Sequence, residues 1–224
     1  MNIDVSTQTY VKDVSYRYFD IKKAKIVLIG DIHGRTDIFN EITERVDGEV
    51  DFGLQTGDIE DYRVEPLVPV YFVKGNHENF DLIQAIETGK LRIDYFHIIP
   101  AGVVVSISNI LVAGLGGSYS PKWKPRQRNI SKEEFKAAKS VGQVDILLTH
   151  EAPVGLIKKN GKDCGCEIIN ELMETVKPKY LVCGHNHIKA VKDLNGTRAI
   201  SMPYAWEEYA VLDFASGNIE WRKT

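Results

Sequence analysis

The sequence predicts an α/β protein whose parallel strands end in polar side chains at one edge of a sheet. Residues 25–29 form an aliphatic run typical of strands that are buried on both faces. Four more apolar runs occur at residues 50–56, 70–74, 144–149 and 179–183, and each stops directly before acids, amides or histidines. In open α/β sheets, binding sites form beyond the carboxyl ends of strands. We therefore expect the five strand ends to meet in one crevice.

The residues at these five ends are of the types that bind metal ions. Asp31 and His33 are two positions apart, so in an extended chain they point the same way, and Gly34 allows the chain to turn after them. The other four ends supply Asp58, Asn76, His150, His185 and His187. Five of the six histidines lie at such ends, and only His97 does not. The pattern predicts a metal site with nitrogen and oxygen ligands.

The composition limits the classes of protein to which the chain can belong. With 224 residues, of which 43% are hydrophobic, we expect an N-terminal extension over residues 1–24 and a single domain over residues 25–224. A net charge of -3 provides no overall attraction to nucleic acid or to a membrane surface. No apolar run approaches the roughly 18 residues of a membrane-spanning helix, and the first residues lack the apolar segment of a signal peptide. These features predict a soluble, cytoplasmic protein without a membrane partner.

The first half of the chain predicts two helices and a long loop. Residues 1–24 carry aromatic side chains in partial alternation, which favours an extra edge strand or hairpin over a partner-binding arm. A helix is expected after Arg35, because apolar residues recur every four positions from 38 to 46, and Thr36 or Asp37 can cap it. Residues 59–69 contain two prolines and predict a loop. A short helix should follow Asn79 and end near Gly89.

The second half predicts a hairpin, two helices and a closing set of strands. Residues 103–107 and 110–115 are expected to pair as a hairpin and to begin a second, more antiparallel sheet. Ser131 and Glu134 have the spacing of a capping box at the start of one helix. Another helix carries apolar residues from 169 to 176 and stops before a proline. Residues 198–221 predict strands around a turn that close the second sheet.

One loop of the chain combines cations with an aromatic residue. Trp123 lies among Lys122, Lys124, Arg126 and Arg128, with no acid between them. Such a segment could form a lid or strap for a phosphate-bearing polymer such as nucleic acid. The alternative interpretation is an ordinary solvated loop.

The number of candidate ligands indicates two metal ions. Two aspartates, one asparagine and four histidines exceed what one divalent ion requires. A mixed nitrogen and oxygen set without thiolate suits manganese, our first choice, or iron, zinc, cobalt or nickel. The positive charge of two divalent ions exceeds the negative charge of two carboxylates, so the site should attract an anion. A pair of ions can also activate water and clamp a phosphoryl oxygen, which makes phosphoester hydrolysis the expected chemistry.

The ordered motifs resemble those of the calcineurin-like metallophosphoesterases. They are Asp31-Ile32-His33, Gly57-Asp58, Gly75-Asn76-His77-Glu78, Thr149-His150 and Gly184-His185-Asn186-His187. The resemblance implies an α/β/β/α sandwich of two mixed sheets and a dinuclear metal centre. It also implies that Asp31, His33 and His187 hold one ion, that Asn76, His150 and His185 hold the other, and that Asp58 bridges them.

The resemblance further implies roles for four neighbouring residues. His77 corresponds to the histidine that contacts the phosphate and protonates the leaving group, a role that suits an imidazole. Asp61 matches the acid that orients this histidine in protein phosphatases. Arg35 and Lys74 are candidates for binding the substrate. Lys74 stands where protein phosphatases have an arginine, and Tyr62 replaces another, which argues against a protein substrate.

These inferences converge on an enzyme that hydrolyses phosphodiesters or small phosphate esters by attack of a metal-bound hydroxide. The substrate would be a small molecule or a nucleotide, and a homodimer is left open. Residues 75–79 and 113–117 are also similar to the RNA lariat debranching branch of the family, which makes an RNA-processing phosphodiesterase the alternative. That branch has a cysteine at the position of His33 and an extra domain. A second alternative is a non-catalytic binding scaffold of the same fold.

Overall fold

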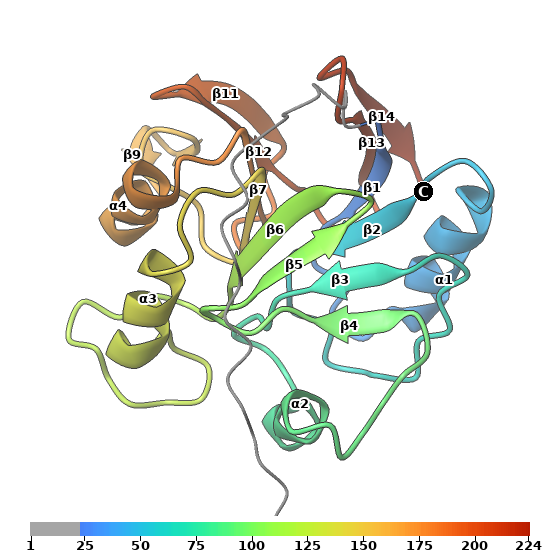
Figure 1. Cartoon of the computed structure of the whole chain (residues 1–224), viewed down its shortest axis with the longest axis horizontal. Helices are drawn as coiled ribbons and strands as arrows, with labels where there is room; N and C mark the ends of the chain where they lie inside the picture. The colour runs from blue at the N-terminus through green and yellow to red at the C-terminus, as the bar shows by residue number, and fades with distance from the viewer. Residues whose placement is uncertain (1–22) are drawn as a thin grey trace, which may run out of the picture.

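Two six-stranded sheets face each other in the computed structural model, which describes residues 23–224 (Figure 1). The predictions for the first 22 residues, including the edge strand or hairpin, lie outside the described residues. No helix of the described part has the length and apolar character needed to cross a bilayer.

The first sheet has the strand order β14-β13-β1-β2-β3-β4. Four of its strands, β1, β2, β3 and β4, run parallel, and they span Lys25–Ile29, Phe52–Gln55, Val70–Phe72 and Phe96–Ile98. The last two strands of the chain, β13 (Glu208–Asp213) and β14 (Ile219–Lys223), pair antiparallel beside β1. The carboxyl ends of β1, β2 and β3 therefore lie next to one another.

The second sheet has the order β11-β12-β10-β7-β6-β5. Its parallel strands β6, β7, β10 and β12 span Ile110–Leu115, Ile146–Thr149, Tyr180–Cys183 and Thr197–Ser201. The antiparallel edges are β5 (Val104–Ile107) and β11 (Ala190–Leu194). A separate two-stranded ribbon joins β8 (Lys158–Lys159) to β9 (Lys162–Asp163).

Two expectations about the second sheet were wrong. It is not the more antiparallel one, because each sheet has three parallel and two antiparallel neighbour pairs. The end of the chain closes the first sheet and not the second, since β13 pairs with β1 in the register Lys25↔Asp213. Consecutive buried residues such as Ala210 and Val211 fit the interior of either sheet, so the apolar pattern alone could not assign this strand.

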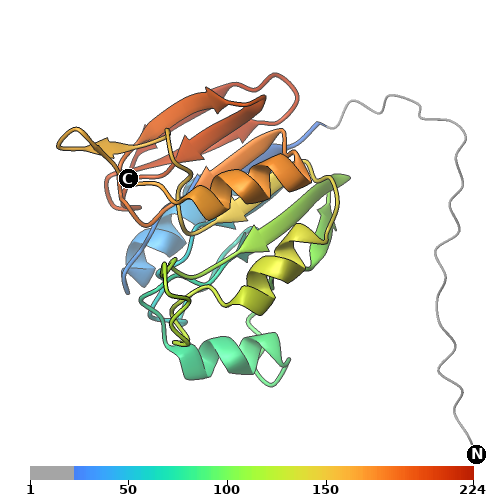
Figure 2. The same cartoon turned by 90° about the vertical axis from the view of Figure 1, so that its left-hand side faces the viewer.

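Helices cover the outer face of each sheet, which confirms the α/β/β/α sandwich. Helices α1 (Thr36–Arg45) and α2 (Phe80–Glu87) pack against the first sheet through a cluster that includes Phe39, Ile42 and Ile83. Helices α3 (Lys132–Lys139) and α4 (Glu167–Val176) lie side by side on the second sheet (Figure 2). Between the sheets, side chains such as Leu28, Leu54 and Leu148 form the central core.

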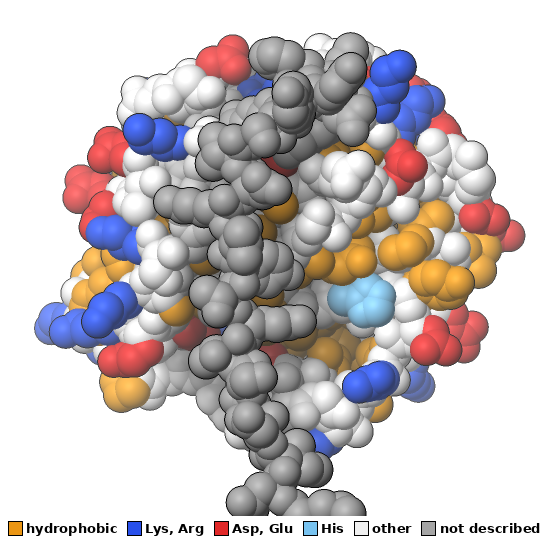
Figure 3. Space-filling model, in the orientation of Figure 1, with side chains coloured by type: hydrophobic (Ala, Val, Ile, Leu, Met, Phe, Trp, Pro, Cys, Tyr) orange, Lys and Arg blue, Asp and Glu red, His pale blue; other side chains and the backbone are white. Residues whose placement is uncertain are grey.

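The edge strands β4 and β5 leave some apolar side chains in contact with solvent. Figure 3 shows hydrophobic side chains over the region of β3 and β4, on the face of the molecule that Figure 1 presents. Tyr95, directly before β4, and Val104, the first residue of β5, are among the exposed large hydrophobic residues of the described part. They lie at the open edges of the two sheets and not at the strand ends that carry the polar motifs.

The helix ends match the predictions except at α1. Asn79 caps α2, Ser131 and Glu134 form the predicted capping box of α3, and α4 ends at Lys177 before the proline. The N-cap of α1 is Arg35, and neither Thr36 nor Asp37 caps it. Asp37 instead binds the Arg35 guanidinium through both carboxylate oxygens, at 3.0 and 2.9 Å.

Candidate metal centre

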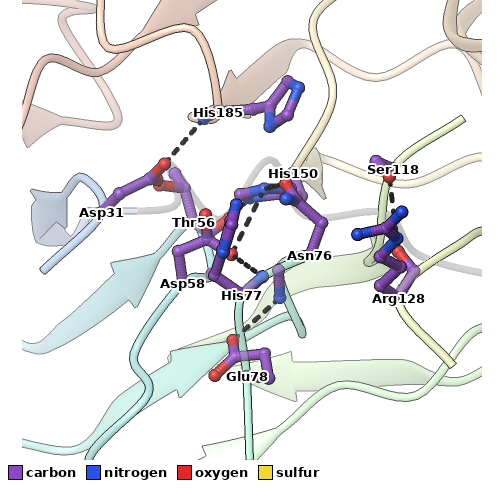
Figure 4. A network of polar contacts seen from close by, with 12 residues as sticks. Asp31, Thr56, Asp58, Asn76, His77, Glu78, Ser118, Arg128, His150 and His185 are labelled. Carbon is purple, nitrogen blue, oxygen red and sulfur yellow. Dashed lines mark hydrogen bonds and ion pairs between the residues drawn. The ribbon is translucent and has the colours of Figure 1, made fainter. Parts of the chain in front are cut away.

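The polar side chains that follow β1, β2, β3, β7 and β10 meet where the two sheets face each other (Figure 4). Two glycines of the motifs make this approach possible. A Cβ atom on Gly184 would lie 2.3 Å from Asp31 Oδ1, and one on Gly75 would lie 2.0 Å from Asp58 Oδ1. Only a residue without a side chain fits at either position.

A first group of donors consists of Asp31, His33 and His187, whose ligand atoms all lie within 4.8 Å of one another. His187 Nε2 is 2.9 Å from Asp31 Oδ2 and 3.3 Å from His33 Nε2. Two nitrogens that bind one ion at about 2.0 to 2.1 Å in tetrahedral geometry are also about 3.3 Å apart. The spacing of these donors therefore fits a divalent metal ion.

A second group consists of Asp31, Asp58 and His150, all fully or almost fully buried. His150 Nε2 lies 2.8 Å from Asn76 Oδ1 and 3.6 Å from Asp58 Oδ1, so the asparagine belongs to the same cluster. The other Asp58 oxygen lies 3.8 Å from His33 Nε2 in the first group. Asp58 thus reaches one nitrogen of each group, the position expected of a bridging ligand.

Several of these residues have an unusual backbone conformation. His33, Asp58, His185 and His187 have φ angles of 43°, 55°, 65° and 54°, in the left-handed region that non-glycine residues rarely adopt. Each such residue costs on the order of 1–3 kcal/mol, and such costs concentrate at functional sites. The left-handed backbone directs these four candidate ligands to positions that an extended strand could not reach.

Hydrogen bonds behind two histidines set which ring nitrogen faces the site. His33 Nδ1 lies 2.7 Å from a Glu60 carboxylate oxygen, and His150 Nδ1 lies 2.8 Å from the Thr56 carbonyl. Both partners are acceptors, so each Nδ1 carries a proton and each Nε2 is the ring nitrogen that faces the donor group. This arrangement is the usual support of metal-binding imidazoles.

The electrostatics of the buried residues keep Asp31 ionised. Burial alone would raise the pKa of Asp31, but its hydrogen bond to His187 and the nearby His150 hold this pKa below its usual value. Burial would likewise lower the pKa of His150, but Asp31 and Asp58 outweigh it and raise that pKa. The carboxylates therefore stabilise positive charge at this point.

His185 lies at the margin of the two groups. Its backbone amide donates to Asp31 Oδ2 at 3.0 Å, while its ring lies 4.9 Å from that of His150 and its Nε2 lies 3.9 Å from Glu151 Oε1 (Figure 4). Burial, followed by the neighbouring His150, lowers the pKa of His185 and favours the neutral ring. The lowered pKa favours the neutral form that a ligand requires, although His185 belongs to neither group.

His77 is exposed and lies at the mouth of the site. Its amide donates to Asp58 Oδ1 at 2.7 Å, and the residue lines a pocket of about 520 Å³ together with Asn76 and Arg128. Asp61 is not directed to His77, because both of its carboxylate oxygens accept from Arg63, two residues further along the same loop. The imidazole is thus placed beside the donor groups with its ring in the open pocket.

The two cations expected to bind substrate have carboxylate partners. Arg35 binds Asp37, and Lys74 forms a partly buried ion pair with Glu134. The Arg128 guanidinium, in contrast, has no ion-pair partner among the described residues, and the residue lines the pocket that contains His77. Figure 4 shows Arg128 beside Ser118, whose amide donates to the Arg128 carbonyl at 2.8 Å.

Four residues near the site were not recognised in the sequence. Glu60 lies in the loop after β2 and contacts His33, and Glu78 lies in the motif after β3 and accepts from the Ile59 amide. Both contacts depend on how the chain turns after Asp58. Tyr204 stacks on His187, and Trp206 stacks on Tyr204. The aromatic pair in Met202-Pro203-Tyr204-Ala205-Trp206 was the one visible signal.

Comparisons with known proteins agree with this geometry. The family model of the calcineurin-like phosphoesterases matches residues 24–189. A lariat debranching enzyme of Entamoeba histolytica is 21% identical in an alignment of 239 positions that spans 79% of this chain and 68% of that protein. A lariat debranching enzyme of Drosophila pseudoobscura pseudoobscura is 24% identical over 62% of this chain, which spans only 33% of that protein.

Solved structures show the same fold. The protein TT1561 of Thermus thermophilus superimposes with a TM-score of 0.71 at 15% identity, over 90% of this chain and 99% of that one. The similarity to lariat debranching enzymes is confirmed at low sequence identity, and the two-sheet architecture is confirmed by the superposition. The chain belongs to the calcineurin-like phosphoesterase family of metal-dependent hydrolases.

Proposed function

We propose that this protein binds two divalent metal ions and hydrolyses phosphodiesters or small phosphate esters. The observation that supports it most is the pair of donor groups that share Asp31 and that Asp58 reaches from one side to the other. Asp31, His33 and His187 would hold one ion. Asp58, Asn76, His150 and His185 would complete the other, with Asp58 shared, and manganese is the expected metal.

The bound ions would supply Lewis acidity to a phosphoryl oxygen and lower the pKa of the attacking water. The protein residues do the rest. Glu60 and the Thr56 carbonyl hold the His33 and His150 rings in one tautomer, which keeps the donor geometry unchanged during turnover. The buried Asp31 and Asp58 carboxylates limit the excess positive charge, so that the product phosphate can leave.

His77 is proposed as the general acid. Its exposed ring lies in the open pocket beside Asn76, and its backbone is fixed by the bond from its amide to Asp58. When the water oxygen bonds to phosphorus, the bond from phosphorus to the leaving oxygen breaks, and the imidazolium donates its proton to that oxygen. Asp61 is held by Arg63, so its proposed orienting role would require release from that pair.

Arg128 is the best-placed cation for a substrate phosphate. It lines the same pocket as His77, and its forked guanidinium can bind two phosphate oxygens at once. Arg35 and Lys74 remain candidates, but each must first leave its carboxylate partner. The exposed loop that contains Arg128 would therefore add a phosphate-binding cation to the residues at the five strand ends.

The test is hydrolysis of bis-p-nitrophenyl phosphate with and without added manganese, combined with elemental analysis of the protein. Wild-type protein should be active only with metal. Asp58→Ala should lose both metal and activity. His77→Ala should keep its metal and lose about 10² to 10⁴ in kcat on a phosphodiester with an alkoxide leaving group, the usual contribution of a general acid, but much less on bis-p-nitrophenyl phosphate, whose nitrophenolate leaves without a proton. His97→Ala, on β4, serves as the control histidine. Metal binding without hydrolysis of any phosphoester would instead support the non-catalytic scaffold.

A debranching-type nuclease is the second candidate function. The similarity to lariat debranching enzymes and the exposed cations Lys122, Lys124 and Arg126 favour it. Replacing these three by glutamine should then reduce cleavage of branched or linear RNA and leave bis-p-nitrophenyl phosphate hydrolysis unchanged. Equal RNA cleavage by the triple variant and wild-type protein would remove this candidate. Cytoplasmic location and a homodimer stay predictions.

A further inference from the structure

Two aromatic rings extend outward from the first donor group. The Tyr204 ring stacks on the His187 imidazole with the centroids 3.7 Å apart and the planes at 20°. The Trp206 indole stacks on Tyr204 with a centroid distance of 4.1 Å and an angle of 15°. The His33 ring lies 5.8 Å from Tyr204 and 6.3 Å from Trp206. The stack therefore borders both histidines of the group.

The segment that carries these rings is fixed to the strand end that carries Asp31. The Ala205 amide donates to the Asp31 carbonyl at 3.1 Å. The Pro203 carbonyl packs so closely on Gly30 that a Cβ atom there would lie 1.9 Å from it. Met202, Pro203 and Ala205 are buried, while Tyr204 and Trp206 alternate with them and remain partly exposed. The two rings are thus held in a constant position relative to the donor group.

Core packing does not account for Trp206. Of the three tryptophans, Trp123 packs against the cluster under α3 and α4, and Trp221 packs against the core between the sheets. Trp206 belongs to none of the three apolar clusters of the described residues, and Tyr204 does not either. The ring partners of Trp206 in this part of the chain are Tyr204 and His33. A large, partly exposed ring in this position is a ready surface for another planar group.

We propose that Trp206, backed by Tyr204, forms a platform on whose outer face a nucleobase of the substrate stacks, so that the substrates are nucleotide phosphoesters. This inference rests on the proposed function, because it assumes that the adjacent donor group engages the phosphate. Base stacking on aromatic side chains is strong and tolerates any base, since every base has a flat face. The platform selects substrates with a base next to the phosphate and does not read a sequence.

The competing role for the stack is to orient the His187 ring. Orientation alone would affect every substrate equally, whereas a base platform affects only substrates that carry a base. The test therefore compares adenosine 5′-(methyl phosphate) with ribose 5-(methyl phosphate), which differ only by the base. Both are assayed with manganese on wild-type protein and on Trp206→Leu.

Trp206→Leu should lower kcat/KM for the adenosine substrate by about 5- to 150-fold, the range measured for loss of one stacked base. It should change kcat/KM for the ribose substrate by less than about twofold. Trp206→Phe should recover part of the loss, and Trp221→Leu, which removes another partly buried tryptophan, should change neither substrate. An equal loss on both substrates, or no loss on either, would overturn the platform.

A binding measurement separates failure of the platform from failure of the proposed function. AMP should bind wild-type protein at least about fivefold more tightly than ribose 5-phosphate does and should quench tryptophan fluorescence, and both effects should vanish in Trp206→Leu. If wild-type protein hydrolyses neither ester yet shows this difference, the platform stands and the proposed hydrolysis fails. If AMP and ribose 5-phosphate bind equally, the platform is refuted, whatever the activity.

Discussion

Replacing Glu78 by glutamine is expected to loosen the two loops that follow β2 and β3. Glu78 accepts four hydrogen bonds, from the backbone amides of Ile59 (3.2 Å), Glu60 (3.1 Å) and Gly75 (2.9 Å) and from the Tyr62 hydroxyl (2.7 Å). One carboxylate therefore joins the loop after Asp58 to the turn before Asn76. No other side chain of the described residues accepts a hydrogen bond from these amides.

The expected change in the free energy of unfolding follows from how many of the four hydrogen bonds to Glu78 each variant loses. A glutamine oxygen can replace Oε2 and keep its three donors, but the amide nitrogen would then face the Gly75 amide. An unsatisfied buried donor costs about 1–3 kcal/mol, so Glu78→Gln should lower the free energy of unfolding by about that amount. Glu78→Ala leaves all four donors without their acceptor, and the loss should reach about 3 kcal/mol or more.

Urea unfolding of both variants measures this effect, provided that the slope of the transition is unchanged. Glu44→Gln is the matched control, because Glu44 lies on the exposed face of α1 and should change stability by less than about 0.5 kcal/mol. Both variants should also bind manganese more weakly, since the loops carry Asp58 and Asn76. If Glu78→Gln and Glu78→Ala unfold within about 0.5 kcal/mol of the wild-type protein, the carboxylate does not hold the loops.

Three further predictions address the surroundings of the site. Glu60→Ala should weaken manganese binding by about 10- to 100-fold in calorimetric titration, because the His33 ring loses the partner that sets its tautomer, and an unchanged affinity would exclude this role. Arg128→Gln should raise KM for a phosphodiester about tenfold at constant manganese affinity, as expected for one lost charged hydrogen bond, and a fall in kcat alone would contradict ground-state binding. The third concerns acid stability. Burial alone would raise the pKa of Glu134, but the Lys74 hydrogen bond and charge outweigh it and hold this pKa below 4.5. The stability from this pair is therefore complete above about pH 4.5 and is lost as the pH falls through the lowered pKa, so Glu134→Gln should flatten the acid limb of the pH–stability curve. An identical acid limb in the variant would show that the pair contributes nothing.

The strand ends could be predicted because their signal is local. An aliphatic run followed by an acid, an amide or a histidine occupies fewer than ten residues, and the repetition of this pattern five times identified the crevice and its donors. The capping box at Ser131 and Glu134 is local in the same way, and the structure confirms it. Such features need no knowledge of which strands are neighbours.

The features that the sequence did not predict depend on distant contacts or on single backbone angles. β13 joins β1 across more than 180 residues, and its buried residues would suit either sheet. The Glu60 backbone adopts a φ of 64°, and in the turn that results Glu60 meets His33 while Asp61 meets Arg63. No spacing of residues in the sequence predicts this backbone angle. The Tyr204 and Trp206 stack depends on where the loop after β12 crosses β1, which again is tertiary information.

The site is assembled from both sheets, so metal binding would be linked to the stability of the fold. The first sheet contributes Asp31, His33, Asp58 and Asn76, and the second contributes His150, His185 and His187. Without ions, the protein bears the cost of left-handed backbones and of buried carboxylates at the sheet edge. Ions that bind only the folded chain would stabilise it by about 2.7 kcal/mol at a hundredfold excess over Kd, an amount similar to the cost of one or two strained residues. The donors would then tie the two sheets together at the end where their strands stop, so loading the site would offset part of its strain.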